Sequence, residues 1–349
     1  MKRAVITGAT GAVGMALIDK CIRENAAVTV IVRPGSRRRK LLDKFSAIEI
    51  IEAGLSDLAE LARTNAGNCG IEYSADSLCA VQSDLKPADS SIGESIFYHL
   101  AWDGTVGAAR NDVSLQDDNV RYALDAVRLA AALGCTTFVI AGSQAEYGRC
   151  DEKLTPDTPC HPENEYGRAK LEAGNKCSAL CRELGLKFIR TRILSVYGPY
   201  DGDGSMISAT IDKLLKGQEA PLSKGEQLWD YLYSADAADM LYLLGECGKD
   251  AHTYLVASGN SRALREYIDE ICDTIRDMSG EYDFAPGNPA IGLIPYSNSQ
   301  VMHLAADISQ TVKDTGYTPD TPFREGIRTT AEHRLKNAAA NCGGQRPGC

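Results

Sequence analysis

The first fourteen residues constrain the fold of this chain more than any other stretch. An apolar strand signal at 4–6 runs directly into Gly8, Gly11 and Gly14, and an apolar helix pattern follows. Glycines at such points allow a tight turn, close approach of backbone to a pyrophosphate, and close packing of helix on strand. We therefore predict a dinucleotide-binding turn made by Gly8, Thr10, Gly11, Ala12, Val13 and Gly14.

A second constellation lies in the middle of the chain. The apolar strand 137–141 is followed by small residues that leave Ser143 at its tip, and a helix pattern opens at Tyr166. Tyr166 and Lys170 are four residues apart, so a helix places both on one face. A phenol, whose ordinary pKa is ~10, becomes a useful acid or base when a nearby ammonium lowers that pKa. Ser143, Tyr166 and Lys170 are thus predicted to hold a substrate oxygen and exchange its proton.

Together these motifs resemble the short-chain dehydrogenase/reductase superfamily. The glycine spacing is G-x-x-G-x-x-G, and Tyr147-Gly148 follows the serine. The stretch from Arg192 to Pro199, with Tyr197-Gly198-Pro199, and the length look like its extended branch, the NAD(P)-dependent sugar-nucleotide epimerases, dehydratases and reductases. The resemblance covers roughly residues 1–330. It implies an α/β fold: a Rossmann-type doubly wound parallel sheet with a smaller, mostly C-terminal substrate-binding domain.

The expected domain division follows from this resemblance. The NAD(P)-binding domain comprises 1–195 plus roughly 228–256, and the substrate-binding domain comprises 196–227 and 257–336. The polar stretch 64–94 is expected to be an inserted surface excursion. The Ala- and Gly-rich tail 337–349 is expected to be disordered.

The choice of cofactor depends on the end of the second strand, 27–32. In dinucleotide folds an acid at this place accepts from the ribose 2′-hydroxyl, whereas Arg accommodates a 2′-phosphate. No acid occurs between Val28 and Leu42. Arg33 and one of Ser36 or Arg37 are therefore predicted to contact the phosphate of NADP, with NAD as the alternative. Arg39 and Lys40 are interpreted as a solvated basic turn.

The resemblance implies further contacts. Leu100 and Ala101 match the turn that passes beneath the nicotinamide ribose, and Asn119 matches an Asn that supports the active-site water and lysine. His99 is interpreted as a strand residue. The family's adenine-contacting Asp is replaced by Gly54-Leu55, with Asp84-Leu85 as a second candidate. Gly134 and Gly185 are in place to cap the helices 113–133 and 166–184. In the extended branch that helix pair forms a homodimer contact.

Composition excludes several classes of protein. The net charge of −10 argues against a nucleic-acid binder. No run of about 18 apolar residues predicts a membrane span, and the N-terminus enters a strand at once. We expect a cytoplasmic protein whose twelve cysteines are reduced, with no metal site. Asp201-Gly-Asp203-Gly is not a calcium loop, because the required glutamate at its twelfth position is absent; Asp212 is the nearest acid.

The reaction is narrowed by what the chain lacks. The 4,6-dehydratases that it resembles carry Asp-Glu where this chain has Gln144 and Ala145, and Glu146 should point elsewhere because strand-like direction alternates. Dehydration is therefore not expected. Two reactions remain: reduction of a 4-keto nucleotide sugar, and 4-epimerisation with retained NAD. Arg33 favours the reduction, because an Arg at this place favours NADPH. A non-catalytic dinucleotide sensor is the rival from another class, and it would not need the complete catalytic set.

The substrate half departs from the family pattern at two positions. Trp229 stands where many relatives carry an Arg that contacts the diphosphate, and Ser195 replaces a common substrate-facing Asn. Lys224 or Arg262 is the expected substitute for the missing charge. Gln144, Ser195 and Tyr231 are predicted to contact the nucleotide-sugar substrate.

Overall fold

The computed structural model describes residues 1–66 and 94–342. At its centre is a seven-stranded sheet in the order β10-β6-β5-β4-β1-β2-β3, in which every neighbouring pair is parallel. Its strands are β1 Arg3–Thr7, β2 Ala27–Val32, β3 Ile48–Glu52, β4 Ser95–His99, β5 Thr137–Ser143, β6 Lys187–Ile193 and β10 His252–Val256. The predicted doubly wound parallel fold is confirmed.

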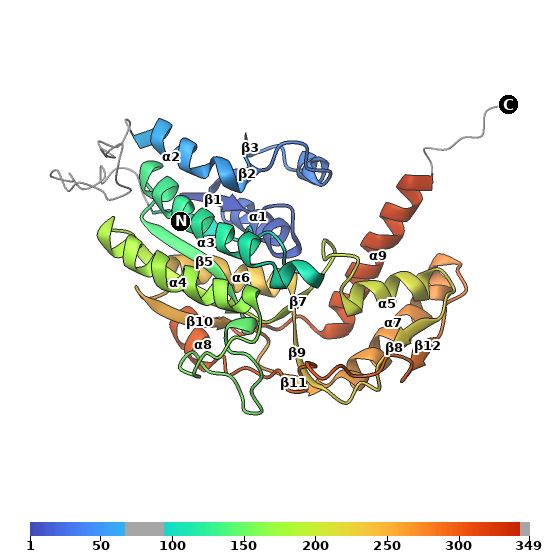
Figure 1. Cartoon of the computed structure of the whole chain (residues 1–349). Helices are drawn as coiled ribbons and strands as arrows, with labels where there is room; N and C mark the ends of the chain where they lie inside the picture. Colours follow the sequence, from blue (N-terminus) through green and yellow to red (C-terminus); the bar gives the residue numbers. More distant parts are fainter. Residues whose placement is uncertain (67–93, 343–349) are drawn as a thin grey trace.

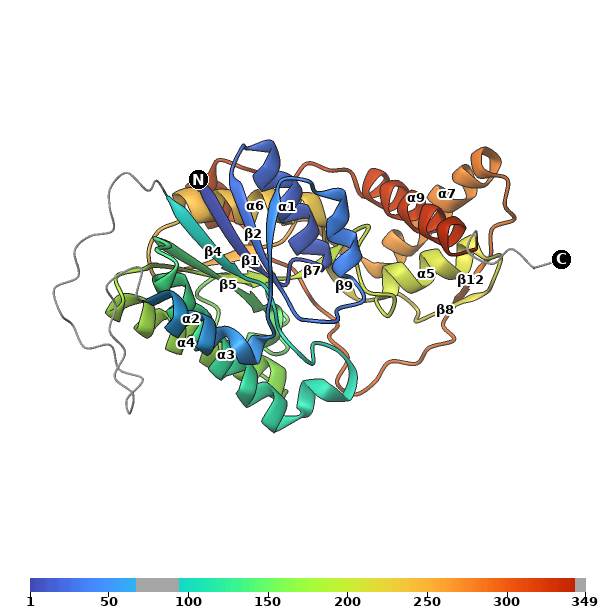
Figure 2. The same ribbon diagram turned by 90° about the horizontal axis from the view of Figure 1, so that it is seen from above.

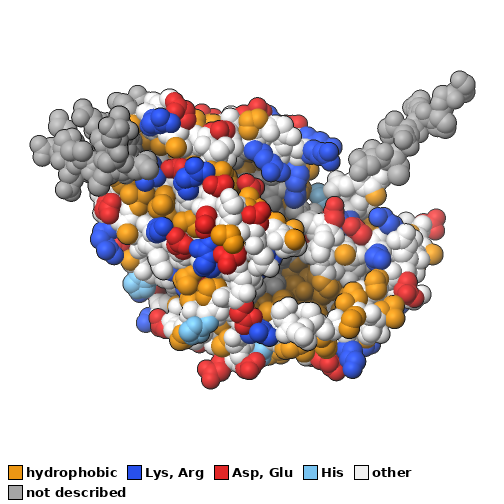
Figure 3. Space-filling model, in the orientation of Figure 1, with side chains coloured by type: hydrophobic (Ala, Val, Ile, Leu, Met, Phe, Trp, Pro, Cys, Tyr) orange, Lys and Arg blue, Asp and Glu red, His pale blue; other side chains and the backbone are white. Residues whose placement is uncertain are grey.

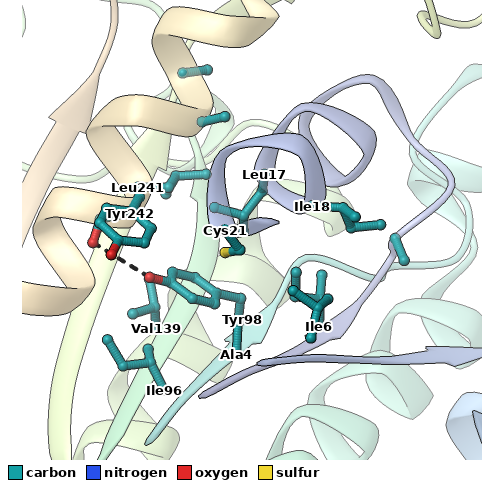
Figure 4. Packing of buried hydrophobic residues seen from close by; sticks show 14 of the residues in the cluster. Ala4, Ile6, Leu17, Ile18, Cys21, Ile96, Tyr98, Val139, Leu241 and Tyr242 are labelled. Carbon is teal, nitrogen blue, oxygen red and sulfur yellow. Dashed lines mark hydrogen bonds between the residues drawn. The ribbon is translucent and has the colours of Figure 1, made fainter. Parts of the chain in front are cut away.

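Helices cover both faces of this sheet (Figures 1 and 2). One face carries α2 Leu58–Ala66, α3 Val113–Ala132 and α4 Glu165–Glu183, and the other carries α1 Ala12–Arg23, α6 Ser234–Cys247 and α8 Ser309–Thr315. Successive residues of a strand point to opposite faces of the sheet, so they pack against different helix layers. Phe97 packs towards α2–α4, whereas Ile96 and Tyr98 pack towards α1 and α6. Figure 4 shows Tyr98 among these side chains, its hydroxyl donating to the Tyr242 carbonyl over 3.4 Å.

The remaining elements form a smaller part beside the sheet (Figure 2). They are the sheet β11-β9-β7, the pair β12-β8, and three helices. Their bounds are β7 Ser195–Tyr197, β8 Ala220–Leu222, β9 Leu228–Tyr233, β11 Ser261–Ala263, β12 Pro289–Ile291, α5 Met206–Leu215, α7 Leu264–Tyr282 and α9 Phe323–Cys342. Short 3₁₀ helices lie at η1 Arg39–Lys44, η2 Leu55–Asp57, η3 Gly107–Asn111 and η4 Gln144–Glu146.

Several boundaries differ from those the sequence predicted. Within 228–256, α6 and β10 belong to the main layers, but β9 pairs in the small sheet. Helix α9 continues to Cys342, six residues into the tail for which disorder was expected, because the alanines at 338–340 are strong helix formers. Of the expected excursion 64–94, α2 includes 64–66; 67–93, with Asp84, lie outside the described residues.

Two glycines end helices as predicted. Gly134 and Gly185 adopt φ values of 69° and 70° directly after the C-caps of α3 and α4, a conformation that side chains rarely adopt. Across the part of the chain that the structure describes, no helix is long and apolar enough to cross a membrane. In the same residues no cluster of His, Cys, Asp or Glu is arranged to hold a metal ion.

Candidate active site

The glycine turn connects β1 to α1 and leaves space at one position. Gly8 has φ 73°, and a Cβ there would lie 2.7 Å from the Ala101 nitrogen. A Cβ on Gly14 would collide with the Gly8 carbonyl oxygen. A Cβ on Gly11 would meet only that same oxygen, at an ordinary 3.6 Å. Packing of the protein therefore explains Gly8 and Gly14, whereas the open space at Gly11 fits the approach of a bound group.

The start of α1 has the character of an anion site. Gly11 is its N-cap and offers no side-chain hydrogen bond to the first turn, which contains no acidic residue. Backbone N–H groups at a helix N-terminus favour a phosphate when no side chain satisfies them. The predicted residues Thr10, Ala12 and Val13 surround this point. The turn thus fits the pyrophosphate of a dinucleotide.

The predicted phosphate contacts follow β2. Arg33 and Arg37 are exposed and Ser36 is half-buried. The guanidinium of Arg33, with 72% of its side chain exposed, lies 3.9 Å from the Asp103 carboxylate, a weak surface pair. Figure 3 shows Lys and Arg side chains gathered over this segment. The arrangement leaves Arg33 able to turn to a ligand phosphate.

The neighbouring basic residues are engaged by the protein. Arg38 donates from Nη2 to the Tyr200 carbonyl over 2.5 Å, joining this segment to the smaller part of the molecule. Burial lowers the pKa of Arg38. Arg39 pairs with Asp43 over 2.6 Å, in agreement with its interpretation as part of a surface turn.

At the end of β4 the chain passes close to the glycine turn. The backbone nitrogens of Leu100 and Ala101 donate to the Thr7 carbonyl and hydroxyl, both over 3.3 Å. The Thr7 hydroxyl also contacts His99 Nδ1 at 3.0 Å. Burial lowers the pKa of His99 to about 3, so the imidazole is neutral. His99 is therefore a buried residue at the end of β4, a strand residue as interpreted from the sequence.

The three predicted catalytic residues meet at the carboxyl end of β5. Ser143 is the last residue of that strand, and its hydroxyl lies near enough to Tyr166, in the first turn of α4, to act on the pKa of that phenol. Lys170 lies one turn further along α4, with Nζ 5.8 Å from the centre of the Tyr166 ring. Its ammonium donates to the Ala141 carbonyl over 2.7 Å. A serine, a phenol and an amine from three sequence positions therefore share one site.

Burial dominates the protonation of this set. It raises the pKa of the Tyr166 phenol, so the lowering that the sequence predicted from the Lys170 ammonium is not seen; Ser143 and the charge of Arg110 act to lower this pKa without outweighing burial. It lowers the pKa of Lys170 to about 7, although the negative charge of Glu146 acts against this. The indole ring of Trp102 covers the ammonium, its centre 3.8 Å from Nζ. The lysine can therefore change its charge near neutral pH.

The loop from β4 to α3 is fixed by two buried residues of α3. Gln116 accepts from Trp102 Nε1 over 2.8 Å and donates to the carbonyls of Gly104 and Ala109. Asn119 accepts from the backbone nitrogen of Asp103 over 3.0 Å and donates to its carbonyl over 2.9 Å.

Asn119 hydrogen-bonds backbone groups of Asp103 and Leu115, so it also positions the loop. Its support of an active-site water and of the lysine, which the resemblance implies, stays a prediction. Sequence reasoning missed Gln116 entirely. Gln116 lies four residues before the apolar Val120, so its position on the inner face of an amphipathic helix was the available sequence signal, and the structure buries it completely.

The Glu146 carboxylate is engaged by Arg192 and not by Tyr166, but residues 144–146 form a 3₁₀ helix, so the strand-like alternation argued from the sequence is not the reason. Glu146 is fully buried, pairs with Arg192 over 2.8 Å and accepts from the Ser143 backbone nitrogen. Its neighbours Gln144 and Ala145 bring no carboxylate to the serine. No carboxylate from this turn is therefore available for acid–base chemistry beside Tyr166.

A cavity of about 450 Å³ lies between α5, β8 and β9. Trp229 and Tyr231 line it, and Trp229 Nε1 donates to the Ser195 hydroxyl over 2.8 Å. Figure 3 shows the surface hollowed, with hydrophobic side chains inside, between the sheet layers and the smaller part. Lys213 lines this cavity, a residue that the sequence did not single out.

A second cavity, of about 460 Å³, also touches Tyr231. Arg262 lies here, where it pairs with Glu270 and stacks over the ring of Tyr267 at 4.0 Å. That Lys224 or Arg262 replaces the missing diphosphate contact stays a prediction; Arg262 is paired with an acid, and it stands opposite Trp229 in the β11–β9 register. Lys213, which lines the same cavity as Trp229, is a further candidate.

Comparison with known proteins is consistent with this geometry. The model of the NAD dependent epimerase/dehydratase family matches residues 4–257. The chain is 25% identical over 355 residues to dTDP-glucose 4,6-dehydratase of Neisseria meningitidis serogroup B, covering 97% of this chain and 94% of that protein.

Solved structures resemble the whole chain in fold. UDP-glucose 4-epimerase of Thermotoga maritima, solved with UDP-glucose, superimposes with a TM-score of 0.74 at 21% identity, covering 96% of this chain and 99% of that one. UDP-glucose 4-epimerase of Thermus thermophilus, solved with NAD, gives a TM-score of 0.74 at 19% identity, covering 95% and 98%. The chain is an enzyme that belongs to the NAD dependent epimerase/dehydratase family, within the extended short-chain dehydrogenase/reductases.

Proposed function

We propose that the enzyme reduces a 4-keto nucleotide sugar with NADPH, and that Tyr166 donates the proton to the carbonyl oxygen. The observation that carries this proposal is the meeting of Ser143, Tyr166 and Lys170 beside the glycine turn. The bound nicotinamide would supply the hydride. The residues of the chain would orient the carbonyl and deliver the proton.

Each member of the set has a distinct part. Ser143 holds the carbonyl oxygen by a hydrogen bond next to the Tyr166 hydroxyl. Tyr166 transfers its proton to that oxygen as negative charge develops there. The ammonium of Lys170 stabilises the phenolate that results, and it is held in place by Ala141.

The surroundings of the serine favour a plain hydride transfer over dehydration. Loss of water from a sugar needs an additional acid and base beside the reacting carbons. Gln144 and Ala145 offer neither, and the Glu146 carboxylate is held by Arg192. Although a related protein is a dTDP-glucose 4,6-dehydratase, we therefore infer a different reaction for this chain.

NADP is the proposed cofactor, with NAD as the alternative. Support for NADP comes from Arg33 and Arg37, exposed directly after β2, and from Ser36 between them. Support for NAD comes from the Thermus thermophilus epimerase, which was solved with it. The open space at Gly11 and the uncapped start of α1 would hold the pyrophosphate of either.

The cavity beside Trp229 is the proposed site for the nucleotide of the substrate. Its aromatic side chains suit a flat base, and Lys213 supplies a positive charge for a phosphate. Ser195 and Tyr231 belong to neighbouring strands, β7 and β9, at the same register position. Gln144 directly follows Ser143, so it is placed to contact the sugar.

4-Epimerisation is the second candidate, because two neighbours in fold are UDP-glucose 4-epimerases. The same residues would then first remove and later return the hydroxyl proton. The two reactions differ in their use of cofactor. A reductase consumes one NADPH for each product, whereas an epimerase retains its NAD unchanged.

We also propose that the protein forms a cytoplasmic homodimer through α3 and α4, which pack side by side (Figure 1). Leu171, Leu180 and Leu184 remain partly exposed along α4, and Tyr122 along α3. Other apolar residues of the predicted stripe, Ala173, Cys177 and Cys181, are buried in the core of the protomer. The apolar strip is therefore narrower than the sequence indicated.

A panel of sugar nucleotides tests the proposed reaction. The purified protein is incubated with 4-keto nucleotide sugars and NADPH, and with UDP-glucose and other 4-hydroxy sugars in the presence of NAD. Reduction of a 4-keto sugar with matching loss of NADPH supports the proposal. Interconversion of 4-hydroxy epimers without net loss of cofactor would establish the epimerase instead. Absence of both reactions across the panel would contradict both.

A further inference from the structure

Arg110 lies on the face of the proposed proton donor. It belongs to η3, in the loop between β4 and α3, and the carbon at the centre of its guanidinium is 4.3 Å from the centre of the Tyr166 ring. The edge of Trp102 meets the same ring at 6.2 Å, with an angle of 87° between the planes. The catalytic phenol is therefore enclosed by a cation and an indole from one loop.

No acidic side chain of the described residues forms an ion pair with Arg110. Its Nη1 donates to the Thr105 carbonyl over 3.1 Å, which fixes the side chain without neutralising it. Arg168, on the outer side of α4, is a contrast, since it pairs with Asp117, Glu165 and Glu172. The charge of Arg110 thus acts mainly on the ring beneath it.

The loop that carries Arg110 is held rigidly against α3. Gln116 binds the carbonyls of Gly104 and Ala109, on both sides of the short turn that leads to Arg110. Gly104 has φ 70°, and a Cβ there would lie 2.6 Å from a methyl carbon of Leu115, so this turn requires glycine. The backbone on both sides of this turn is consequently held by Gln116, and the guanidinium by its hydrogen bond to Thr105.

The other groups that act on Tyr166 or lie near it cannot supply a constant positive charge. The Ser143 hydroxyl is neutral, and Glu146 acts in the opposite direction. Lys170 is positive only while protonated, and its pKa is lowered to about 7 by burial. A guanidinium stays charged throughout this range. Arg110 is therefore the positive group that persists above neutral pH.

We propose that Arg110 is a positioning residue whose fixed positive charge favours the phenolate form of Tyr166 and strengthens it as a proton donor. A phenolate ring is richer in electrons than a phenol ring, so a cation on its face binds the ionised form more tightly. The inference rests on the proposed function, in which Tyr166 exchanges the substrate proton. It adds a second cation to the one supplied by Lys170.

Spectrophotometric titration of Tyr166 tests this inference without any substrate. The chain has 15 tyrosines, so phenolate absorbance is recorded as the difference between each protein and the same protein with Tyr166→Phe. Arg110→Gln is expected to lower the ionisation constant of this phenol by roughly threefold to tenfold. Arg110→Lys keeps a positive charge at this position, so its Tyr166 ionisation constant should lie close to that of the unmodified protein. Arg110→Met replaces Arg110→Gln if the glutamine variant does not fold.

A matched control comes from α3. The guanidinium of Arg121 lies 5.1 Å from the ring of Tyr122, away from Tyr166, so Arg121→Gln should leave the difference titration unchanged. An unchanged Tyr166 titration in a folded Arg110→Gln protein overturns the inference. A change in Arg110→Lys as large as that in Arg110→Gln overturns it too, because the charge would then not be the cause. Because no turnover is measured, failure of the proposed reaction would be seen separately, in the sugar-nucleotide panel.

Discussion

The indole of Trp229 donates a hydrogen bond of 2.8 Å to the hydroxyl of Ser195, across neighbouring strands of the small sheet. The two departures from the family pattern that are visible in the sequence therefore form one contact. An indole has a single donor and no charge, so the serine satisfies it completely. Trp229, which is predicted to stand where many relatives carry an Arg, therefore has a polar partner of its own.

We expect nucleotide binding to change the fluorescence of Trp229. The chain has two tryptophans, and Trp229 lines the cavity of about 450 Å³ while Trp102 lies over Lys170. Titration with UDP should alter the emission of the unmodified protein and of Trp102→Phe, but not that of Trp229→Phe. A signal that disappears with Trp102 and persists without Trp229 would place the nucleotide elsewhere.

Replacing Tyr166 by Phe should separate binding from chemistry. The ring and its packing against Trp102 remain, but the proton donor is lost. Turnover should fall by roughly two to four orders of magnitude, the usual contribution of a general acid. Cofactor affinity, measured by calorimetry, should stay close to that of the unmodified protein. Full activity in this variant would show that another group donates the proton.

Arg33 should decide between the two cofactors. Its weak pairing with Asp103 at 3.9 Å leaves it available to a 2′-phosphate. We expect NADPH to bind more tightly than NADH, by a margin that shrinks as salt screens the charge. Arg33→Asp should reverse the order, whereas Lys40→Asp, in the exposed turn further on, should not. Equal or tighter binding of NADH to the unmodified protein would refute this assignment.

These tests concern details that the sequence could foresee only in part. The glycines at 8, 11 and 14 predicted the dinucleotide-type sheet, and the spacing of Tyr166 and Lys170 predicted that the two lie on one face of a helix, because such spacings are local. The sequence could not foresee that Gln116 holds the loop, or that Arg38 reaches the Tyr200 carbonyl.

Such contacts join residues that are separated in the chain, and they depend on side-chain directions that no periodicity encodes. The same limit applies to substrate recognition. Trp229 was visible as an exception to the family pattern, but its partner became clear only when β7 and β9 were found side by side.

Burial of Lys170 should make stability depend on pH in a defined direction. Its pKa is lowered to about 7 by burial, whereas an exposed lysine in the unfolded chain titrates near ~10.4. Below pH 7 both states are charged, and burying the charge opposes folding. Between the two pKa values the unfolded chain binds more protons, so stability rises with pH.

Comparison with Lys170→Met isolates this effect. The variant should be more stable than the unmodified protein at and below pH 7. Its advantage should shrink by up to about 1.4 kcal/mol for each pH unit from 7 towards 10. Urea unfolding of the cofactor-free proteins across this range measures the difference. An advantage that stays constant with pH would mean that the pKa of Lys170 is the same in the folded and the unfolded protein.

The dimer prediction depends on the outer surface of α3 and α4. Leu171 and Leu180 are partly exposed on α4, and a two-fold partner could cover both by packing the same helix pair against itself. Light scattering at micromolar concentration should give twice the mass of one chain.

Paired Leu171→Glu and Leu180→Glu changes should split the dimer, because like charges would face each other across the contact. Leu293→Glu, at a position that is 61% exposed beyond β12, is the matched control and should leave the mass unchanged. Removal of residues 343–349 should also leave it unchanged, and a monomeric unmodified protein would refute the dimer.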